Sequence, residues 1–207
     1  MKTSRRGVLV AIEGIDGTGK TTLQRGLGRA WRRRKLRVVE FQEPSRGPSG
    51  LRARRSSGKD PWMAALAFTD DRRHQRPRVD RALRSGAIVL LDRSLYSTLA
   101  YQGSALPAAR RRELERLQSD ATTLPDRVVL LDLPLRVAER RMQDRGGARA
   151  PTEHREVLRR ASRAYRQLAR KLGWIVLDAR NGAEELLAEL DRRLTPWVLR
   201  HATRERT

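Results

Sequence analysis

Eight consecutive residues near the N-terminus have types and spacing suited to binding phosphate. Residues 14–21 read GIDGTGKT and match the pattern G-x-x-x-x-G-K-S/T without a gap. The glycines let backbone N–H groups approach phosphate oxygens that a side chain would keep away. Lys20 can add a positive charge at the β- and γ-phosphates, and the Thr21 hydroxyl can bind Mg²⁺. The residues expected at a bound nucleotide are Gly14, Gly17, Thr18, Gly19, Lys20, Thr21 and Thr22.

The residues on either side of this run have the patterns of a strand and a helix. Residues 8–12 are continuously apolar and partly β-branched, which is typical of a strand buried on both faces. After the run, Leu23, Leu27 and Trp31 recur at helical spacing. This context favours a phosphate loop for ATP or GTP over an ordinary glycine-rich turn with an exposed lysine. The loop alone leaves the phosphate acceptor open.

A second pair of charged residues follows another apolar run. Residues 88–91 are apolar, and Asp92 and Arg93 come directly after them. The sequence therefore places a carboxylate and a guanidinium at the end of a buried strand. The plain structural alternative for Asp92 is a cap on the turn that follows the strand.

Apolar runs alternate with helical patterns along the whole chain, without a repeat or a low-complexity linker. Strands are predicted at residues 8–12, 38–41, 87–91, 127–133 and 174–178. Besides the helix after Thr21, helices are predicted at residues 62–73, 79–84, 108–119, 135–145, 153–172 and 183–199, with Gly86 and Gly173 at helix ends. The alternation predicts an α/β fold in which a five-stranded parallel sheet is flanked by helices on both faces, as one domain over residues 1–207. Ligands of such sheets bind beyond the carboxyl ends of the strands, where both motifs lie.

The chain is strongly basic, with 46 lysines and arginines against 24 aspartates and glutamates and a formal net charge of +22. A nucleic-acid surface usually gathers its charge in one stripe and adds stacking aromatic residues. Here the arginines are scattered through every predicted helix, and aromatic residues make up only 4% of the chain. Solvated helix faces with a few phosphate ligands explain this distribution better, so nucleic acid is an unlikely partner.

The sequence contains no cysteine, which excludes a disulfide framework and a thiolate metal site and fits a reducing cytoplasm. The longest apolar runs are far shorter than the roughly 18 residues that a membrane-spanning helix needs. The basic N-terminus has no separate apolar signal segment before Gly14. We therefore expect a soluble cytoplasmic protein with no membrane partner.

Several motifs together resemble those of the thymidylate kinase family, in both order and spacing. The most specific are the phosphate loop with Asp16 and residues 92–103, which read DRSLYSTLAYQG. The resemblance extends from about residue 8 to residue 197. Its other parts are Glu43-Pro44, Phe68 with Arg72, Pro125-Asp126 before LLDLP at residues 130–134, Arg141, Arg145 and Tyr165.

The resemblance implies a P-loop NTPase fold of the nucleoside monophosphate kinase type, a homodimer, and a defined reaction. In that reaction the γ-phosphoryl group of Mg·ATP moves to the 5′-phosphate of dTMP, and dTDP and ADP are formed. Two anions must then be brought together, so the site needs several fixed cations besides Mg²⁺. The acceptor oxygen is already ionised at neutral pH, so no strong general base is required.

The resemblance also implies a role for each site residue. Thr21 would bind Mg²⁺. Arg93 would bind phosphate, and Asp92 would either orient Arg93 or reach Mg²⁺ through water. Phe68 would stack on thymine, and Tyr101 would lie against the deoxyribose and reject a 2′-hydroxyl. On the acceptor side, Asp16 would lie near the sugar and phosphate, Glu43 near the sugar, Arg72 near a base oxygen, and Thr98 and Gln102 near the base.

Residues 145–152 resemble the mobile lid of the family's bacterial form. The phosphate loop carries Thr18 and no arginine, so positive charge at the transferring group must come from elsewhere. Arg145 and Arg149 are the candidates, which makes the implied catalytic set Lys20, Asp16, Arg93, Arg145 and Arg149. An ordinary basic loop between two helices is the alternative.

The sequence departs from the family pattern in two places on the acceptor side. Ser94 stands where an aromatic residue is usual, and residues 45–48, Ser-Arg-Gly-Pro, replace a glycine-rich stretch. Three alternatives stay open. They are a deoxynucleoside kinase with Glu43 as base or another nucleoside monophosphate kinase, a basic P-loop ATPase that binds nucleic acid, and a family member that has lost activity.

Overall fold

A computed structural model describes residues 7–56, 58, 60–144, 146 and 152–202. Its sheet contains β1 (Leu9–Glu13), β2 (Val38–Gln42), β3 (Ile88–Asp92), β4 (Arg127–Asp132) and β5 (Ile175–Asp178). All pairings are parallel, in the order β2-β3-β1-β4-β5. The helices are α1 (Lys20–Arg33), α2 (Pro48–Ser56), α3 (Pro61–Arg84), α4 (Leu95–Tyr101), α5 (Ala108–Ala121), α6 (Leu135–Gln143), α7 (Thr152–Leu172) and α8 (Ala183–Ala202), with a short 3₁₀ turn at Gly103–Ala105. The predicted α/β fold with a five-stranded parallel sheet is confirmed.

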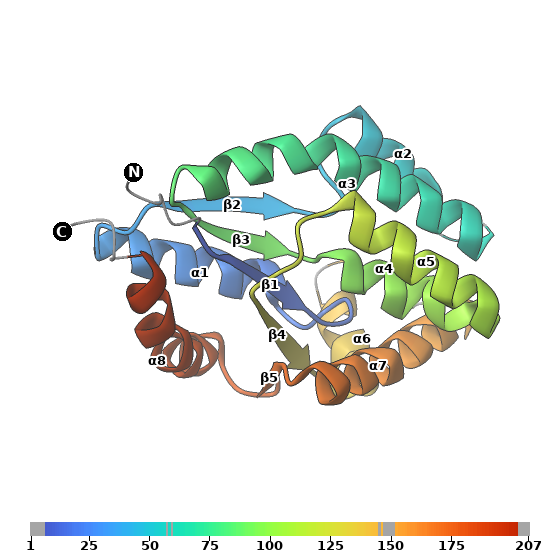
Figure 1. Cartoon of the computed structure of the whole chain (residues 1–207). Coiled ribbons are helices and arrows are strands. Elements are labelled where there is room, and N and C mark those ends of the chain that lie inside the picture. The colour runs from blue at the N-terminus through green and yellow to red at the C-terminus, as the bar shows by residue number, and fades with distance from the viewer. Residues whose placement is uncertain (1–6, 57, 59, 145, 147–151, 203–207) are drawn as a thin grey trace.

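Alternate residues of the central strands pack into two separate cores. Val10 and Ile12 of β1 lie in the core that contains residues of α1, α7 and α8. Leu9 and Ala11 lie in the core that contains residues of α3. Figure 1 shows α1 and α3 on opposite sides of the sheet. Because both faces are covered, β1 and β3 are apolar without alternation up to their last residues.

The register of the sheet brings the ends of three strands to one edge. Asp92 of β3 pairs with Ile12 of β1 on one side and with Gln42 of β2 on the other. The segments that follow these strands therefore start side by side. The arrowheads in Figure 1 point to this edge, where α2, α4 and α6 also lie. The phosphate loop, Glu43-Pro44 and residues 92–103 lie at or beyond it, whereas Pro125-Asp126 precedes β4 and lies at the opposite edge.

Three helices differ from the sequence prediction. The segments predicted separately at 62–73 and 79–84 belong to one helix, α3, which contains Pro77. Proline removes one backbone donor, but α3 is supported along its length by α2, α5 and β3. The short helices α2 and α4 were not predicted. Gly86 and Gly173 have the positive φ angles, 74° and 63°, that are expected just after helices.

Candidate active site

The phosphate loop joins the buried end of β1 to the first turn of α1. Gly14 and Gly17 have φ angles of 145° and 84°, which glycine adopts without strain. A Cβ at Gly14 would lie 2.7 Å from the carbonyl oxygen of Leu131, and one at Gly17 would lie 2.7 Å from that of Ala138. Helix α1 begins without a side-chain cap and without an acidic residue in its first turn. Its positive end is therefore suited to an anion.

The Lys20 side chain is buried against its own loop. Its Nζ atom donates a hydrogen bond to the carbonyl oxygen of Ile15 at 2.8 Å. Burial and the charge of Arg93 lower the pKa of Lys20 to about 8, although Asp16, Asp92 and Glu13 act in the opposite direction. A lysine in this environment gains stabilisation of its charged form from a phosphate placed at the loop.

Thr21 and Asp92 form a site that fits Mg²⁺. The Thr21 hydroxyl donates a short hydrogen bond to Oδ2 of Asp92. The other carboxylate oxygen, Oδ1, is buried and has no hydrogen-bond partner within the part of the chain that the structure describes. A buried carboxylate oxygen needs a partner, and Mg²⁺ is commonly held by one carboxylate, a hydroxyl and nucleotide phosphates. Among the described residues, no group of three or more His, Cys, Asp or Glu side chains could hold a metal ion.

A cleft of about 200 Å³ opens in front of the loop, and we call it the phosphate-loop cleft. Five of the residues predicted at the nucleotide line it, from Gly17 to Thr22. Thr18 does not, because its hydroxyl is buried and donates to the Ile15 carbonyl oxygen at 2.9 Å. Gly14 does not line it either. The lining residues are Asp16, Gly17, Gly19, Lys20, Thr21, Thr22, Gln42, Glu43, Asp92 and Arg93.

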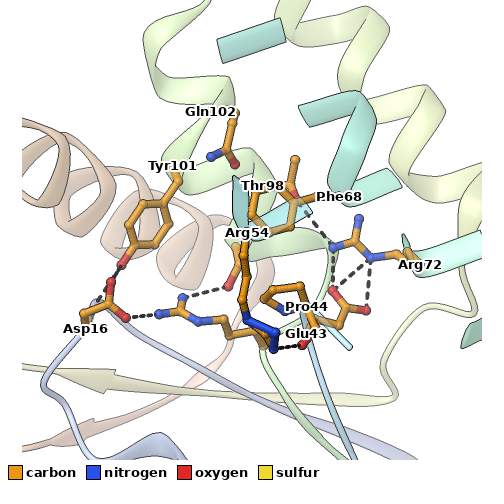
Figure 2. A pocket seen from close by; sticks show the side chains of 11 residues that line it. Asp16, Glu43, Pro44, Arg54, Phe68, Arg72, Thr98, Tyr101 and Gln102 are labelled. Atoms are coloured by element: carbon orange, nitrogen blue, oxygen red, sulfur yellow. Dashed lines mark hydrogen bonds and ion pairs between the residues drawn. The ribbon is translucent and has the colours of Figure 1, made fainter. Parts of the chain in front are cut away.

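A second cavity, of about 220 Å³, lies beside this cleft, and we call it the Phe68 cavity (Figure 2). All eight residues predicted on the acceptor side line it. Three of them, Asp16, Glu43 and Arg93, line both cavities. The complete lining is Asp16, Glu43, Pro44, Arg54, Phe68, Arg72, Arg93, Ser97, Thr98, Tyr101 and Gln102.

Arg93 lies where the two cavities meet and is held by several partners. Its Nη2 atom donates a short hydrogen bond to Asp16. Its Cζ atom lies 5.3 Å from the ring centre of Tyr101, within range of a cation–π contact. The Tyr101 hydroxyl accepts from the Asp16 backbone N–H at 3.2 Å, and Figure 2 shows it pointing at the Asp16 carboxylate. Burial raises the pKa of Asp16, but Arg93 and Lys20 outweigh this effect and hold that pKa below its usual value.

Arg72 and Glu43 form a buried ion pair in the wall of the Phe68 cavity. Nε of Arg72 donates to both carboxylate oxygens of Glu43, at 3.1 and 3.0 Å. The side chains are only 3% and 8% exposed, so the pair is shielded from water. The guanidinium also donates to the Thr98 hydroxyl at 3.3 Å and to Gln118. Figure 2 shows the bonds from Arg72 to Glu43 and to Thr98.

Phe68 is partly exposed and belongs to neither hydrophobic core. Its ring lines the cavity. Tyr101 and Gln102 reach the same cavity from the end of α4. An apolar ring facing polar side chains suits a planar, hydrogen-bonding ligand.

The sequence prediction omitted three lining residues, namely Arg54, Pro44 and Ser97. Arg54 projects from α2 and donates to the carbonyl oxygens of Pro44 at 2.8 Å and Ser45 at 3.2 Å. Figure 2 shows its side chain beside Pro44. One of many arginines in an unpredicted helix gives no sequence signal. Pro44 and Ser97 were already part of the quoted motifs, Glu43-Pro44 and residues 92–103, and those motifs were the available signal for them.

The altered stretch after Pro44 is held by the buried carboxylate of Asp71. Ser45 donates to Asp71 through its backbone N–H, at 2.7 Å, and through its hydroxyl. The Ser49 hydroxyl donates to the same carboxylate at 2.7 Å. Ser45, at the start of this departure from the family pattern, and Ser49, directly after it, therefore fix the loop to α3.

The two predicted lid arginines, Arg145 and Arg149, lie outside the described residues. Helix α6 ends at Gln143 and helix α7 begins at Thr152, so the predicted lid falls between two helices.

Comparisons with known proteins agree on one family. The family model described as thymidylate kinase matches residues 12–190. A protein of Pyrobaculum aerophilum named probable thymidylate kinase is 36% identical over 187 residues, which are 87% of this chain and 93% of that protein. Thymidylate kinases of Xanthomonas campestris pv. campestris and Xanthomonas oryzae pv. oryzae are each 37% identical, over 88% of this chain and 81% of those proteins.

Proposed function

The chain belongs to the thymidylate kinase family, and we propose that its phosphate-loop cleft binds Mg·ATP while the Phe68 cavity binds dTMP. It is an ATP-dependent nucleoside monophosphate kinase that forms dTDP and ADP. One observation supports this division of the site. The two cavities share Asp16, Glu43 and Arg93, so ligands in them would meet at a boundary that contains a guanidinium with its side chain only 16% exposed.

On the donor side, the loop amides and the positive end of α1 bind the phosphates. Lys20 exchanges its bond with the Ile15 carbonyl oxygen for the β- and γ-phosphate oxygens. Because these groups belong to a rigid loop, little reorganisation is needed when charge moves during transfer.

Thr21 and Asp92 would hold Mg²⁺, with Oδ1 of Asp92 as the available carboxylate oxygen. The metal ion would neutralise charge on the β- and γ-phosphates.

On the acceptor side, Arg93 binds the 5′-phosphate of dTMP and turns from Asp16 toward it. Before dTMP binds, Asp16 holds Arg93 in place. Asp16 also lies near the sugar of bound dTMP. The acceptor oxygen is already anionic, so positioning and charge neutralisation carry the reaction and no side chain has to remove a proton. Arg145 and Arg149 complete the positive charge around the transferring group.

The contacts to the base and the sugar of dTMP are assigned to residues that line the Phe68 cavity. Phe68 stacks on thymine, and Arg72, Thr98 and Gln102 face its polar edge. Tyr101 lies against the deoxyribose, where its ring leaves no room for a 2′-hydroxyl.

The position of Glu43 argues against a deoxynucleoside kinase. Such an enzyme needs a carboxylate that takes a proton from a neutral hydroxyl. Both oxygens of Glu43 accept hydrogen bonds from Arg72 in a buried pair. This pairing suits a structural role in the cavity wall.

The surroundings and assembly of the enzyme are also part of the proposal. Among the described residues, no helix is long and apolar enough to cross a membrane. We place the enzyme in the cytoplasm, where its nucleotide substrates are, and as a homodimer by family membership.

Acceptor profiling tests the proposed function. Purified protein is incubated with Mg·ATP and, separately, dTMP, dUMP, the ribonucleotides and thymidine, and the products are separated by chromatography. We expect dTDP from dTMP with the highest kcat/KM and no product from thymidine. Absence of dTDP, or faster phosphorylation of thymidine, would contradict the assignment. Omitting Mg²⁺ should abolish turnover.

A further inference from the structure

Glu13, the last residue of β1, is a fully buried carboxylate outside both cavities. It accepts hydrogen bonds from four groups and is itself 0% exposed. Ser94 donates to Oε1 through its backbone N–H at 2.7 Å and through its hydroxyl at 2.6 Å. The hydroxyls of Ser97 and Tyr165 donate to Oε2 at 2.7 and 2.9 Å, and they also lie 2.7 Å from each other, where either can be the donor. Burying a carboxylate costs free energy unless hydrogen bonds compensate for the lost water. A buried carboxylate with this many donors is therefore expected to have a specific role.

The backbone next to these donors is strained. Arg93 has a φ of 71°, in the left-handed region that is unfavourable for a residue with a Cβ. The peptide groups on both sides of it are fixed to β1. The Arg93 N–H donates to the Ile12 carbonyl oxygen at 3.0 Å, and the Ser94 N–H donates to Glu13. The strained conformation therefore persists because its neighbours hold it.

The side chain of Arg93 is also linked to Glu13. Nη1 of Arg93 donates to the Ser97 hydroxyl oxygen at 3.2 Å. The single proton of that hydroxyl goes to Glu13 directly or through the Tyr165 hydroxyl, which lies 2.7 Å from Ser97 and 2.9 Å from Oε2 of Glu13. In both arrangements the proton points away from Arg93, so the hydroxyl oxygen is free to accept from the guanidinium. One carboxylate thus fixes the backbone of Arg93 through Ser94 and its guanidinium through Ser97.

We infer that Glu13 is a positioning residue for the acceptor phosphate. It touches neither cavity, and it acts by holding Arg93 in a conformation that places the guanidinium at their boundary. The inference rests on the proposed function in one respect, since it takes the acceptor to carry a phosphate that Arg93 binds.

The same geometry gives Ser94 a reason to differ from the family pattern. An aromatic residue at position 94 would supply only its backbone N–H to Glu13. The serine adds a hydroxyl, which donates to Glu13 and accepts from the Tyr96 N–H at 3.4 Å to cap α4. This chain therefore ties its phosphate-binding arginine to β1 with one more bond than the motif itself requires.

The test compares two ligands that differ only in the phosphate. The dissociation constants of dTMP and thymidine are measured by calorimetry for the wild type, Glu13→Gln and Ser94→Ala. In Glu13→Gln, one acceptor oxygen becomes an NH₂ donor, so the side chain can no longer accept from both Ser94 and the Ser97 and Tyr165 hydroxyls. We expect dTMP binding to weaken roughly tenfold and thymidine binding to change less than about twofold. Ser94→Ala removes one hydrogen bond to Glu13. It should change the ratio of the dTMP and thymidine dissociation constants in the same direction, by a smaller factor.

Two controls separate positioning from general stability. Thr195→Val breaks the buried hydrogen bond of 2.8 Å between Trp31 and Thr195, far from the site, and should leave the ratio of the two constants unchanged. In an Arg93→Ala background, Glu13→Gln should not change the ratio further, because the group through which it acts is gone.

Each outcome decides the matter. Equal weakening of dTMP and thymidine would mean that Glu13 only supports the fold, and unchanged constants would mean that Arg93 does not depend on it. A further drop of the ratio in the Arg93→Ala background would also overturn the inference. If Glu13→Gln does not fold, as its melting curve would reveal, Ser94→Ala decides alone. Failure of the wild type to bind or phosphorylate dTMP would instead overturn the proposed function.

Discussion

The two cavities of this site are built in different ways. The phosphate-loop cleft is formed mainly by one continuous segment, from Asp16 to Thr22, and its shape is set by backbone conformation at glycines. The Phe68 cavity is lined from the phosphate loop, the end of β2, α2, α3 and the β3–α4 region. Its walls are held by side-chain pairs between segments far apart in the sequence. The first cavity should therefore respond to changes of charge, and the second to changes of packing and pairing.

Buried carboxylates have a particular role on the acceptor side. Asp71 holds the loop after β2 through Ser45 and Ser49. Glu13 holds the turn after β3 through Ser94 and Ser97. Each of the two departures from the family motif places a serine hydroxyl on one of these carboxylates. The segments that follow β2 and β3 are thus fixed by buried carboxylates that each accept several hydrogen bonds.

The largest effect is expected from breaking the Arg72–Glu43 pair. Arg72→Met leaves the Glu43 carboxylate buried and unpaired, which should lower the free energy of unfolding by about 3–5 kcal/mol. Denaturant unfolding measures the loss. Arg110→Met is the matched control, because the Arg110–Glu113 pair is 55% and 51% exposed and should contribute less than about 1 kcal/mol. A loss below about 1 kcal/mol for Arg72→Met would show that the cavity wall does not depend on this pair.

The next effect concerns the phosphate-loop cleft. Lys20→Ala should lower kcat roughly 10²–10³-fold, because one preorganised cation at the transferring phosphoryl group is lost. Steady-state kinetics with saturating dTMP measure it. Lys171→Ala removes an exposed lysine of α7 and should leave kcat unchanged. Wild-type turnover in Lys20→Ala would remove the basis for assigning this cleft to ATP.

A smaller effect is expected at Asp71. Asp71→Ala leaves the donors of Ser45 and Ser49 without their acceptor and should cost about 1–3 kcal/mol of stability. The KM for dTMP should rise several-fold while the KM for ATP stays the same, because only the wall of the Phe68 cavity loosens. The adjacent Asp70 is exposed, and Asp70→Ala should change neither constant. Equal changes in both KM values would mean that the two cavities are not independent.

The smallest effect is the pH dependence of ATP binding. The pKa of Lys20 is lowered to about 8, so its charge is present below that pH and is lost above it. ATP binding needs the charged form and should be roughly tenfold weaker at pH 9 than at pH 7. In the ligand-free protein the sign is opposite, since the unfolded chain holds this proton more tightly and the free energy of unfolding rises with pH above about 8.

The pH profile has its own control. Lys20→Arg carries a charge that persists at pH 9, so its ATP affinity, measured by calorimetry, should not fall in this range. An equal decline in both proteins would assign the titration to a different group.

Much of the fold could be predicted because it depends on local patterns. The five strands are built on short apolar runs, interrupted in β2 by Glu40, and the spacing of the glycines identifies the phosphate loop. Helix α3 was divided in the prediction because proline opposes helix locally, while packing along α3 overrides the break at Pro77. Helices α2 and α4 were missed because they are short, basic or mixed in pattern, and gain their stability from tertiary contacts.

The sequence by itself determined the donor half of this protein, because a phosphate loop is made of neighbouring residues whose conformation depends on their own backbone preferences. It also indicated the acceptor residues through their resemblance to a family. Only the tertiary structure decided that Arg72 is paired with Glu43 and that Arg54 reaches the Phe68 cavity. It also decided that Glu13 accepts hydrogen bonds from Ser94 and Ser97, which follow Arg93. These arrangements depend on strand order and register, which bring distant segments to one edge of the sheet, and no local pattern specifies which side chains then meet.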